Sequence, residues 1–148
     1  MEIERKFTVK TIPLNLSDYP CRKLEQGYLN TAPVVRVRRE DDDYYLTYKG
    51  KGFLVREEYN LPLTQEAYLH LREKADGLII TKDRYLIPYD DKLTIELDIF
   101  SGPLAPLVLA EVEFPTEEEA NAFIAPDWFD KDVTNDPSFT NSALSQMF

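Results

Sequence analysis

Polar and apolar residues alternate with a period of two along most of the chain. The alternation runs through residues 2–9, 25–29, 34–40, 44–49, 53–61, 78–87, 92–101 and 108–114. These segments are rich in β-branched and aromatic residues, and turn residues such as the acidic triplet 41–43 and the Gly-Lys-Gly sequence 50–52 separate them. Each is therefore predicted to be a β-strand.

Helix signals occur at three places only. Thr64 precedes a helical pattern that Gly77 is expected to stop. Thr116 and Glu119 have the spacing of a capping box, and a short third helix is expected after Pro137. The order has no regular βαβ alternation, so we predict one β-rich α+β domain over residues 1–148, with helices covering the apolar faces of the strands from outside.

The polar faces of these strands are highly charged, and the charges are sorted by sign. Arg36 and Arg38 share one face, as do Lys82 and Arg84, whereas Glu111 and Glu113 form a purely acidic pair. The full basic set is Lys6, Arg36, Arg38, Lys49, Arg56, Lys82 and Arg84, and the acidic set is Glu2, Glu4, Glu58, Glu96, Asp98, Glu111 and Glu113. A solvated outer face would explain each strand alone. Soluble surfaces usually intersperse the two signs, however, so the sorting favours an inward-facing arrangement in a closed sheet.

Composition narrows the setting of such a protein. The 148 residues are 43% hydrophobic and 30% charged, and the net charge of −10 argues against binding to a nucleic acid duplex. Basic residues gathered in one cavity could still bind a small polyanion. No apolar run reaches the ~20 residues of a membrane span. The first residues do not resemble a secretory signal, and Cys21 is the only cysteine, so we expect a cytoplasmic protein.

The two sets of charges suit one kind of ligand. Clustered carboxylates are what Mg²⁺ or Mn²⁺ prefers, and arginine and lysine bind phosphate oxygens. Both sets together in one cavity predict a site for a metal-bridged polyphosphate. Phosphoryl transfer there needs positioning, charge neutralisation and an aligned water.

Several motifs resemble the CYTH superfamily, the triphosphate tunnel metalloenzymes, over almost the whole chain. Glu2-Ile3-Glu4-Arg5-Lys6 matches the ExExK signature, which is weak alone. Its companions follow in order, including Val35-Arg36-Val37-Arg38, Lys82-Asp83-Arg84-Tyr85, Glu96-Leu97-Asp98, Glu111-Val112-Glu113 and, near the end, Asn141-Ser142-Ala143-Leu144.

The resemblance implies an eight-stranded antiparallel closed barrel forming a tunnel, usually in a homodimer, that binds a triphosphate with Mg²⁺ or Mn²⁺. The metal ligands it implies are Glu2, Glu4, Asp98, Glu111 and Glu113, and the phosphate-binding residues are Lys6, Arg36, Arg38, Lys49, Lys82 and Arg84. Glu58 or Glu96 would hold a metal-bound water. Tyr28 would work with Lys6, helping the leaving group.

Three functions stay open at this stage. Hydrolysis of inorganic tripolyphosphate is favoured, because the chain is short and shows no aromatic pair required to grip an organic group. A thiamine triphosphatase or a class IV-type adenylate cyclase would use the same triphosphate geometry. A non-catalytic polyphosphate-binding module would not need so many carboxylates.

Three other residues are given structural or passive roles. His70 has no cysteine or histidine partner for a zinc site. Lys131 is expected to be a solvent-exposed lysine, and Trp128 is expected to pack against the exterior of the barrel.

Overall fold

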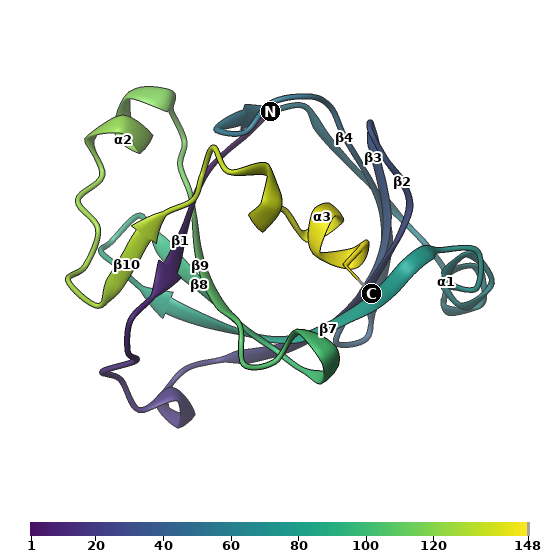
Figure 1. Cartoon of the computed structure of the whole chain (residues 1–148), viewed down its shortest axis with the longest axis horizontal. Helices are drawn as coiled ribbons and strands as arrows, with labels where there is room; N and C mark the ends of the chain where they lie inside the picture. The colour runs from purple at the N-terminus through teal and green to yellow at the C-terminus, as the bar shows by residue number, and fades with distance from the viewer. Residues whose placement is uncertain (148) are drawn as a thin grey trace.

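The alternating segments form nine of the ten antiparallel β-strands in a computed structural model that describes residues 1–147 (Figure 1). The ten strands are β1 (Glu2–Val9), β2 (Cys21–Thr31), β3 (Val34–Glu40), β4 (Asp43–Lys49), β5 (Val55–Arg56), β6 (Glu58–Pro62), β7 (Asp76–Pro88), β8 (Thr94–Phe100), β9 (Val108–Glu113) and β10 (Phe129–Asp132). Their order is β10-β1-β9-β8-β7-β2-β3-β4-β6, and β5 pairs with β1. Every predicted strand is present, although the one predicted at 53–61 is divided into β5 and β6.

The sheet closes because the β5–β6 segment reaches both of its edges. β6 pairs with β4 and places Glu58 opposite Lys49, while β5 pairs with β1 and places Arg56 opposite Glu2. Only Glu57 separates the two short strands. Counted as one strand, they complete a ring of eight, and β10 is an additional strand beside β1 (Figure 1). The predicted antiparallel barrel is therefore confirmed, although the sheet has slightly more strands than the eight expected.

Two helices lie outside the ring, as predicted (Figure 1). The side chain of Thr64 caps α1 (Gln65–Arg72), and that of Thr116 caps α2 (Glu117–Ala122). α1 ends earlier than expected, because Gly77 belongs to β7. Within residues 1–147, no helix combines the length and apolar character needed to cross a bilayer.

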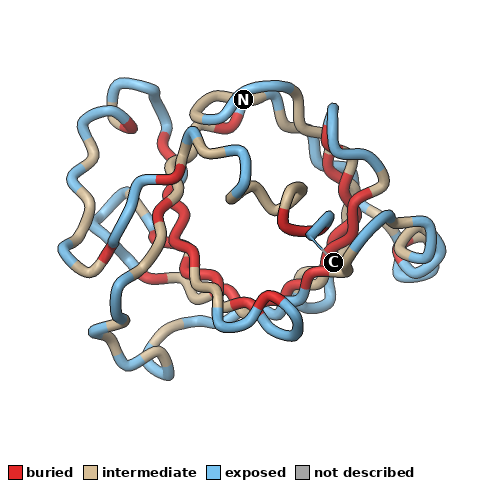
Figure 2. Tube along the Cα trace, in the orientation of Figure 1, coloured by how far each residue is buried: buried red, intermediate tan, exposed pale blue. Residues whose placement is uncertain are grey.

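A hydrophobic cluster covers the outer faces of β1, β8 and β9. Phe7 and Val112 are buried there against Ala120 of α2 and Phe129 of β10. Trp128 packs against the same cluster, as the sequence predicted. Because successive side chains of a strand point to opposite faces, the charged neighbours of these apolar residues point into the barrel. Figure 2 shows buried positions along much of the ring of strands, whereas β4, β5 and β6 are mostly half-buried or exposed.

The C-terminal segment, residues 133–147, turns back into the barrel and differs from the predicted arrangement. Its 3₁₀ helix (Pro137–Phe139) and α3 (Asn141–Ser145) lie inside the ring in Figure 1. Leu144 of α3 is buried with Tyr28 and Ile80 in a second hydrophobic cluster. The prediction that helices pack outside is therefore wrong for α3, because the inner faces of β2 and β7 are partly apolar and α3 covers them.

The approach of α3 to β7 is close enough to require a glycine. Gly77 has a φ of +72°, and a Cβ atom there would lie 2.3 Å from the carbonyl oxygen of Ser145. Glycine adopts positive φ without steric cost and has no side chain to collide with α3. The first residues of β7 therefore seat the C-terminal segment.

Candidate functional site

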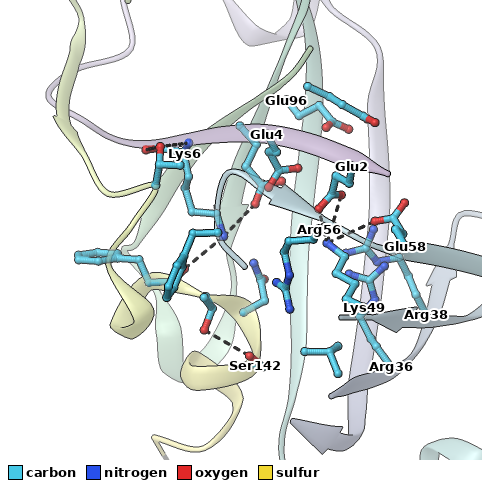
Figure 3. A pocket seen from close by; sticks show the side chains of 18 of the residues that line it. Glu2, Glu4, Lys6, Arg36, Arg38, Lys49, Arg56, Glu58, Glu96 and Ser142 are labelled. Atoms are coloured by element: carbon cyan, nitrogen blue, oxygen red, sulfur yellow. Dashed lines mark hydrogen bonds and ion pairs between the residues drawn. The ribbon is translucent and has the colours of Figure 1, made fainter. Parts of the chain in front are cut away.

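The inward faces of the strands enclose a cavity of about 220 Å³. Every site residue predicted from the sequence lines this cavity, except Lys82 and Asp98. Figure 3 shows side chains from β1, β3, β4, β5, β6 and β8 converging on it, among them Glu4, Arg36 and Lys49. The C-terminal segment adds Asn141 and other lining residues. Alternating charged strands have thus folded with their charges inward.

Three carboxylates from neighbouring strands form a group that could hold a metal ion. Each of Glu4, Glu96 and Glu111 offers an oxygen, and these oxygens lie within 4.8 Å of one another. The register explains the grouping, since Glu96 lies opposite Glu111 on β8 and β9, and Glu4 lies opposite Glu113 on β1 and β9. Hard divalent cations such as Mg²⁺ bind oxygen ligands of this kind.

The electrostatics of this group favour a cation. Burial, together with the charges of Glu111 and Glu2, raises the pKa of Glu4 well above its usual value. Burial also raises the pKa of Glu96, although Arg84 opposes the shift. Ionised carboxylates crowded together in this way repel one another, and a divalent cation would remove that repulsion. The residues present therefore fit Mg²⁺ or Mn²⁺.

Glu111 differs from its two neighbours because cations already surround it. Burial alone would raise its pKa, but Lys6 and Arg84 outweigh burial and hold the pKa well below its usual range. Lys6 Nζ lies 3.2 Å from Glu111 Oε1, and Arg84 Nη2 lies 3.1 Å from Glu111 Oε2. Glu111 thus connects the acidic group to the basic residues of the cavity.

Lys6 remains protonated in this environment. Burial would lower its pKa, but Glu111 and Glu4 raise it above its usual value. Its Nζ also donates a hydrogen bond of 3.2 Å to the carbonyl oxygen of Phe139 in the C-terminal segment. Tyr28 is buried nearby and accepts a hydrogen bond of 3.2 Å from Gln26 Nε2. A protonated amine beside a phenol can stabilise or protonate a departing anion.

A second acidic pair shares Lys49. Lys49 Nζ lies 3.1 Å from Glu2 Oε1 and 3.4 Å from Glu58 Oε2. Burial raises the pKa of Glu2 to about 7. Glu58 is less buried, and its hydrogen bond with Glu2 and the charge of Lys49 lower its pKa to about 2. The two carboxyl groups share contacts with Lys49 and therefore titrate as a pair.

The wall formed by β3 presents two buried guanidinium groups. Arg36 Nη2 donates to Thr47 Oγ1 at 3.2 Å, whereas its buried Nε has no hydrogen-bond partner among residues 1–147. Arg38 Nε donates to Gln26 Oε1 at 2.8 Å. Both guanidinium groups line the cavity, where their other N–H groups can donate to a bound anion.

Lys82 and Asp98 lie behind the cavity wall instead of on it. Lys82 Nζ lies 2.7 Å from Asp98 Oδ2, and Arg84 donates to both oxygens of Asp98 at 2.8 and 2.9 Å. Asp98 is outside the acidic group described above, and its oxygens are engaged by cations. The sequence predicted a phosphate ligand and a metal ligand here, whereas the geometry favours a support for Arg84. Glu96, two residues before Asp98 on β8, belongs to the group of three carboxylates instead.

Comparisons with known proteins agree with this geometry. The CYTH domain family model matches residues 1–132. An inorganic triphosphatase of Nitrosomonas europaea is 40% identical, with 97% of this chain and 96% of the relative covered. An inorganic triphosphatase of Acetivibrio thermocellus is 37% identical, with 97% and 92% covered.

Solved structures give the same result. The crystal structure of the inorganic triphosphatase NE1496 superposes with a TM-score of 0.74 at 36% identity, covering 100% of this chain and 96% of that one. HpAC1 from Hippeastrum, for which a dominant triphosphatase activity is described, superposes with a TM-score of 0.59 at 15% identity, covering 82% and 83%. The second likeness concerns the fold alone.

Proposed function

The chain belongs to the CYTH domain family, and on that premise we propose that it is a divalent-metal-dependent hydrolase of inorganic triphosphate. The observation that carries the proposal is that three carboxylates and several arginine and lysine side chains line one enclosed cavity. At about 220 Å³, the cavity is smaller than the ~300–1,000 Å³ typical of sites for drug-sized ligands. A compact polyanion fits it better than a nucleotide does.

Glu4, Glu96 and Glu111 are the proposed ligands of Mg²⁺ or Mn²⁺, with Glu2 and Glu113 next to them along β1 and β9. When bound, such an ion neutralises phosphate charge and lowers the pKa of a coordinated water. The raised pKa of Glu4 supports this assignment, because a cation favours the ionised form of the carboxylate.

The phosphate chain is proposed to bind along the cationic side chains of the cavity. Arg36 and Arg38 approach it from β3 and Lys49 from β4, and Arg84 is held in place by Asp98. Arginine forks bind phosphate oxygens in pairs, and the guanidinium of Arg36 lines the cavity with N–H donors beyond the one that Thr47 accepts. These contacts would also neutralise negative charge on the oxygens of the phosphoryl group under attack.

Lys6, Tyr28 and Glu58 are the proposed catalytic residues. Lys6 is protonated and can donate a hydrogen bond to the departing phosphate. Tyr28 lies close enough to Lys6 to contribute to the raised pKa of the ammonium group. Although burial opposes the shift, the hydrogen bond with Glu2 and the charge of Lys49 lower the pKa of Glu58 to about 2, so its carboxylate can accept a hydrogen bond from the attacking water and orient it. A carboxylate with so low a pKa is a weak base, so its role is orientation.

A substrate panel tests the proposal. Phosphate release from tripolyphosphate, thiamine triphosphate, ATP and GTP would be measured with Mg²⁺ and with Mn²⁺, and we expect tripolyphosphate to be hydrolysed fastest. Faster release from thiamine triphosphate would reassign the substrate. Formation of a cyclic nucleotide from ATP would indicate the cyclase. Tight binding of tripolyphosphate without turnover under either metal would indicate a binding module.

A homodimer in the cytoplasm is part of the same proposal. The outer face of β6 exposes Tyr59 and Leu61, each 58% accessible, and Tyr59 lies beside Tyr48 with 6.2 Å between ring centroids. Such apolar side chains are suited to a self-association surface. Light scattering tests this by comparing the molar mass of Leu61→Lys with that of the unaltered protein. A monomeric mass for both proteins would contradict the proposed dimer.

A further inference from the structure

Asn141 is the first residue of α3 and lies in the cavity beside the phosphate-binding wall. It belongs to the C-terminal segment, beyond residue 132 where the family match ends. Its side chain bridges two elements of the barrel, because its Oδ1 lies 3.0 Å from Lys82 Nζ on β7 and 3.2 Å from Gln26 Nε2 on β2. The segment is thus tied to the barrel by a polar group as well as by Leu144.

Two cations fix the orientation of both amides in this chain of hydrogen bonds. A lysine ammonium can only donate, so the Asn141 atom facing Lys82 must be the carbonyl oxygen. Arg38 Nε can only donate as well, so the Gln26 atom 2.8 Å from it is also the oxygen. Gln26 therefore directs its NH₂ group to Asn141, and neither amide can flip without losing an acceptor.

The remaining polar atom of Asn141 is its Nδ2 amide, which carries two N–H donors. Among residues 1–147 it has no hydrogen-bond partner, and it is not one of the buried unsatisfied atoms of the structure. The side chain is half-buried and lines the same cavity as Lys6 and Arg36. With the oxygen fixed against Lys82, the amide nitrogen is left for a ligand in the cavity.

We propose that Asn141 is a substrate-binding residue whose Nδ2 donates a hydrogen bond to a phosphate oxygen. The inference rests on the proposed triphosphate function and adds a neutral donor to the cationic wall. It also gives the C-terminal segment a direct part in the site, because the donor is in place only when α3 is docked. The segment then completes the cavity as well as filling one part of the barrel.

Asn141→Asp separates a binding role from a structural one. The aspartate keeps an oxygen for Lys82 and Gln26, so α3 should stay docked, but it presents a second oxygen to the phosphates instead of an N–H group. We expect the Kd for tripolyphosphate, measured by calorimetry without divalent metal, to rise about tenfold or more, with a matching rise in KM when Mg²⁺ is present. The thermal midpoint should not fall.

Gln146→Glu is the matched control. It makes the same amide-to-carboxylate change on the same segment, at an exposed residue outside the cavity, so it adds the same charge without reaching the phosphates. We expect its Kd and KM to stay within about twofold of the unaltered protein, since surface charges are screened by salt. Asn141→Ala, which loses the donor without adding charge, should weaken binding by less than Asn141→Asp.

The outcomes separate the two levels of the proposal. If the unaltered protein binds and hydrolyses tripolyphosphate while Asn141→Asp binds it equally well, the role of Asn141 is overturned and the function stands. The same holds if Gln146→Glu loses as much affinity as Asn141→Asp. If the unaltered protein neither binds nor hydrolyses tripolyphosphate, both the function and the inference fall.

Discussion

The ammonium nitrogen of Lys82 lies 2.7 Å from the carboxylate of Asp98, and neither side chain has any exposed surface. Burial lowers the pKa of Lys82 to about 8, and the charge of Asp98 opposes that shift. Asp98 also receives two hydrogen bonds from Arg84. One carboxylate therefore compensates two buried cations, and its removal should matter more than the removal of either cation.

Asp98→Asn should destabilise the protein by about 3–5 kcal/mol, because it leaves the buried charges of Lys82 and Arg84 without their main partner. Lys82→Met should cost clearly less, since Asp98 keeps both contacts with Arg84 and methionine fills a similar volume. Chemical denaturation of the two variants measures the difference in the free energy of unfolding. Equal losses would contradict the central role of Asp98.

The barrel could be predicted from the sequence because its strands carry their own signals. β1 and β3 begin and end at the predicted residues, and Thr64 and Thr116 cap their helices as expected. β10 was not predicted, because its sequence Phe-Asp-Lys-Asp is mostly charged and becomes a strand only by pairing with β1. Strand pairing of this kind depends on tertiary context more than on local preference.

The sequence predicted which residues gather around the cavity, but not which of them line it and which lie behind its wall. Period-two alternation shows which residues share a face, so the residues that line the cavity could be named. The alternation cannot show how deeply a side chain is buried behind the cavity surface. Glu96 lines the cavity, whereas Asp98, two residues further along β8, is buried behind the wall. The part played by Asn141 depends on how the C-terminal segment folds back, and periodicity has no information on this.

The docking of α3 can be tested through Gly77. Gly77→Ala would place a Cβ atom 2.3 Å from the carbonyl oxygen of Ser145 at a positive φ, so we expect a loss of at least about 2 kcal/mol and a higher KM for triphosphate. Gly102→Ala is the control, because Gly102 also has a positive φ but a Cβ atom there would meet nothing within 4 Å. It should lose only about 1 kcal/mol and keep the KM. If both variants show the same loss of stability and the same KM, backbone strain alone explains the effect of Gly77→Ala, and the contact with Ser145 does not contribute.

Metal binding is best tested at Glu4. Among residues 1–147, Glu4 forms no ion pair, whereas Glu111 is paired with Lys6 and Arg84. Glu4→Gln should therefore lower the affinity for Mn²⁺ by at least about tenfold and reduce metal-dependent phosphate release, with the fold retained. Unchanged Mn²⁺ affinity in a calorimetric titration of Glu4→Gln would remove Glu4 from the metal site.

Glu111→Gln provides the comparison for that variant. It should abolish metal-dependent phosphate release too, but it also removes the ion-pair partner of the buried Lys6 and one of the partners of Arg84, so its free energy of unfolding should fall further than that of Glu4→Gln. Circular dichroism during chemical denaturation measures this difference. Full activity in Glu111→Gln would exclude Glu111 from the mechanism.

The pH dependence of stability gives an independent test of the cavity carboxylates whose pKa values are raised. The pKa of Glu2 is raised to about 7, and the pKa values of Glu4 and Glu96 are also raised. A carboxyl group with a raised pKa in the folded state contributes stability at pH values below its unfolded pKa, near 4.5, and loses that contribution as the pH rises through the folded pKa. Without metal, the thermal midpoint should therefore fall by several degrees between pH 5.5 and pH 8.

Mg²⁺ or Mn²⁺ should reverse that fall, because the cation binds the ionised carboxylates and stabilises the folded state by mass action. We expect the metal-induced rise in the thermal midpoint to be larger at pH 8 than at pH 5.5, where protons compete with the ion. Glu4→Gln should flatten the metal-free pH profile and reduce the metal-induced rise, since it removes one titrating group and one proposed ligand together. Differential scanning calorimetry at both pH values provides the comparison. A metal-induced rise that is equal at the two pH values, or unchanged in Glu4→Gln, would contradict a metal site built on these carboxylates.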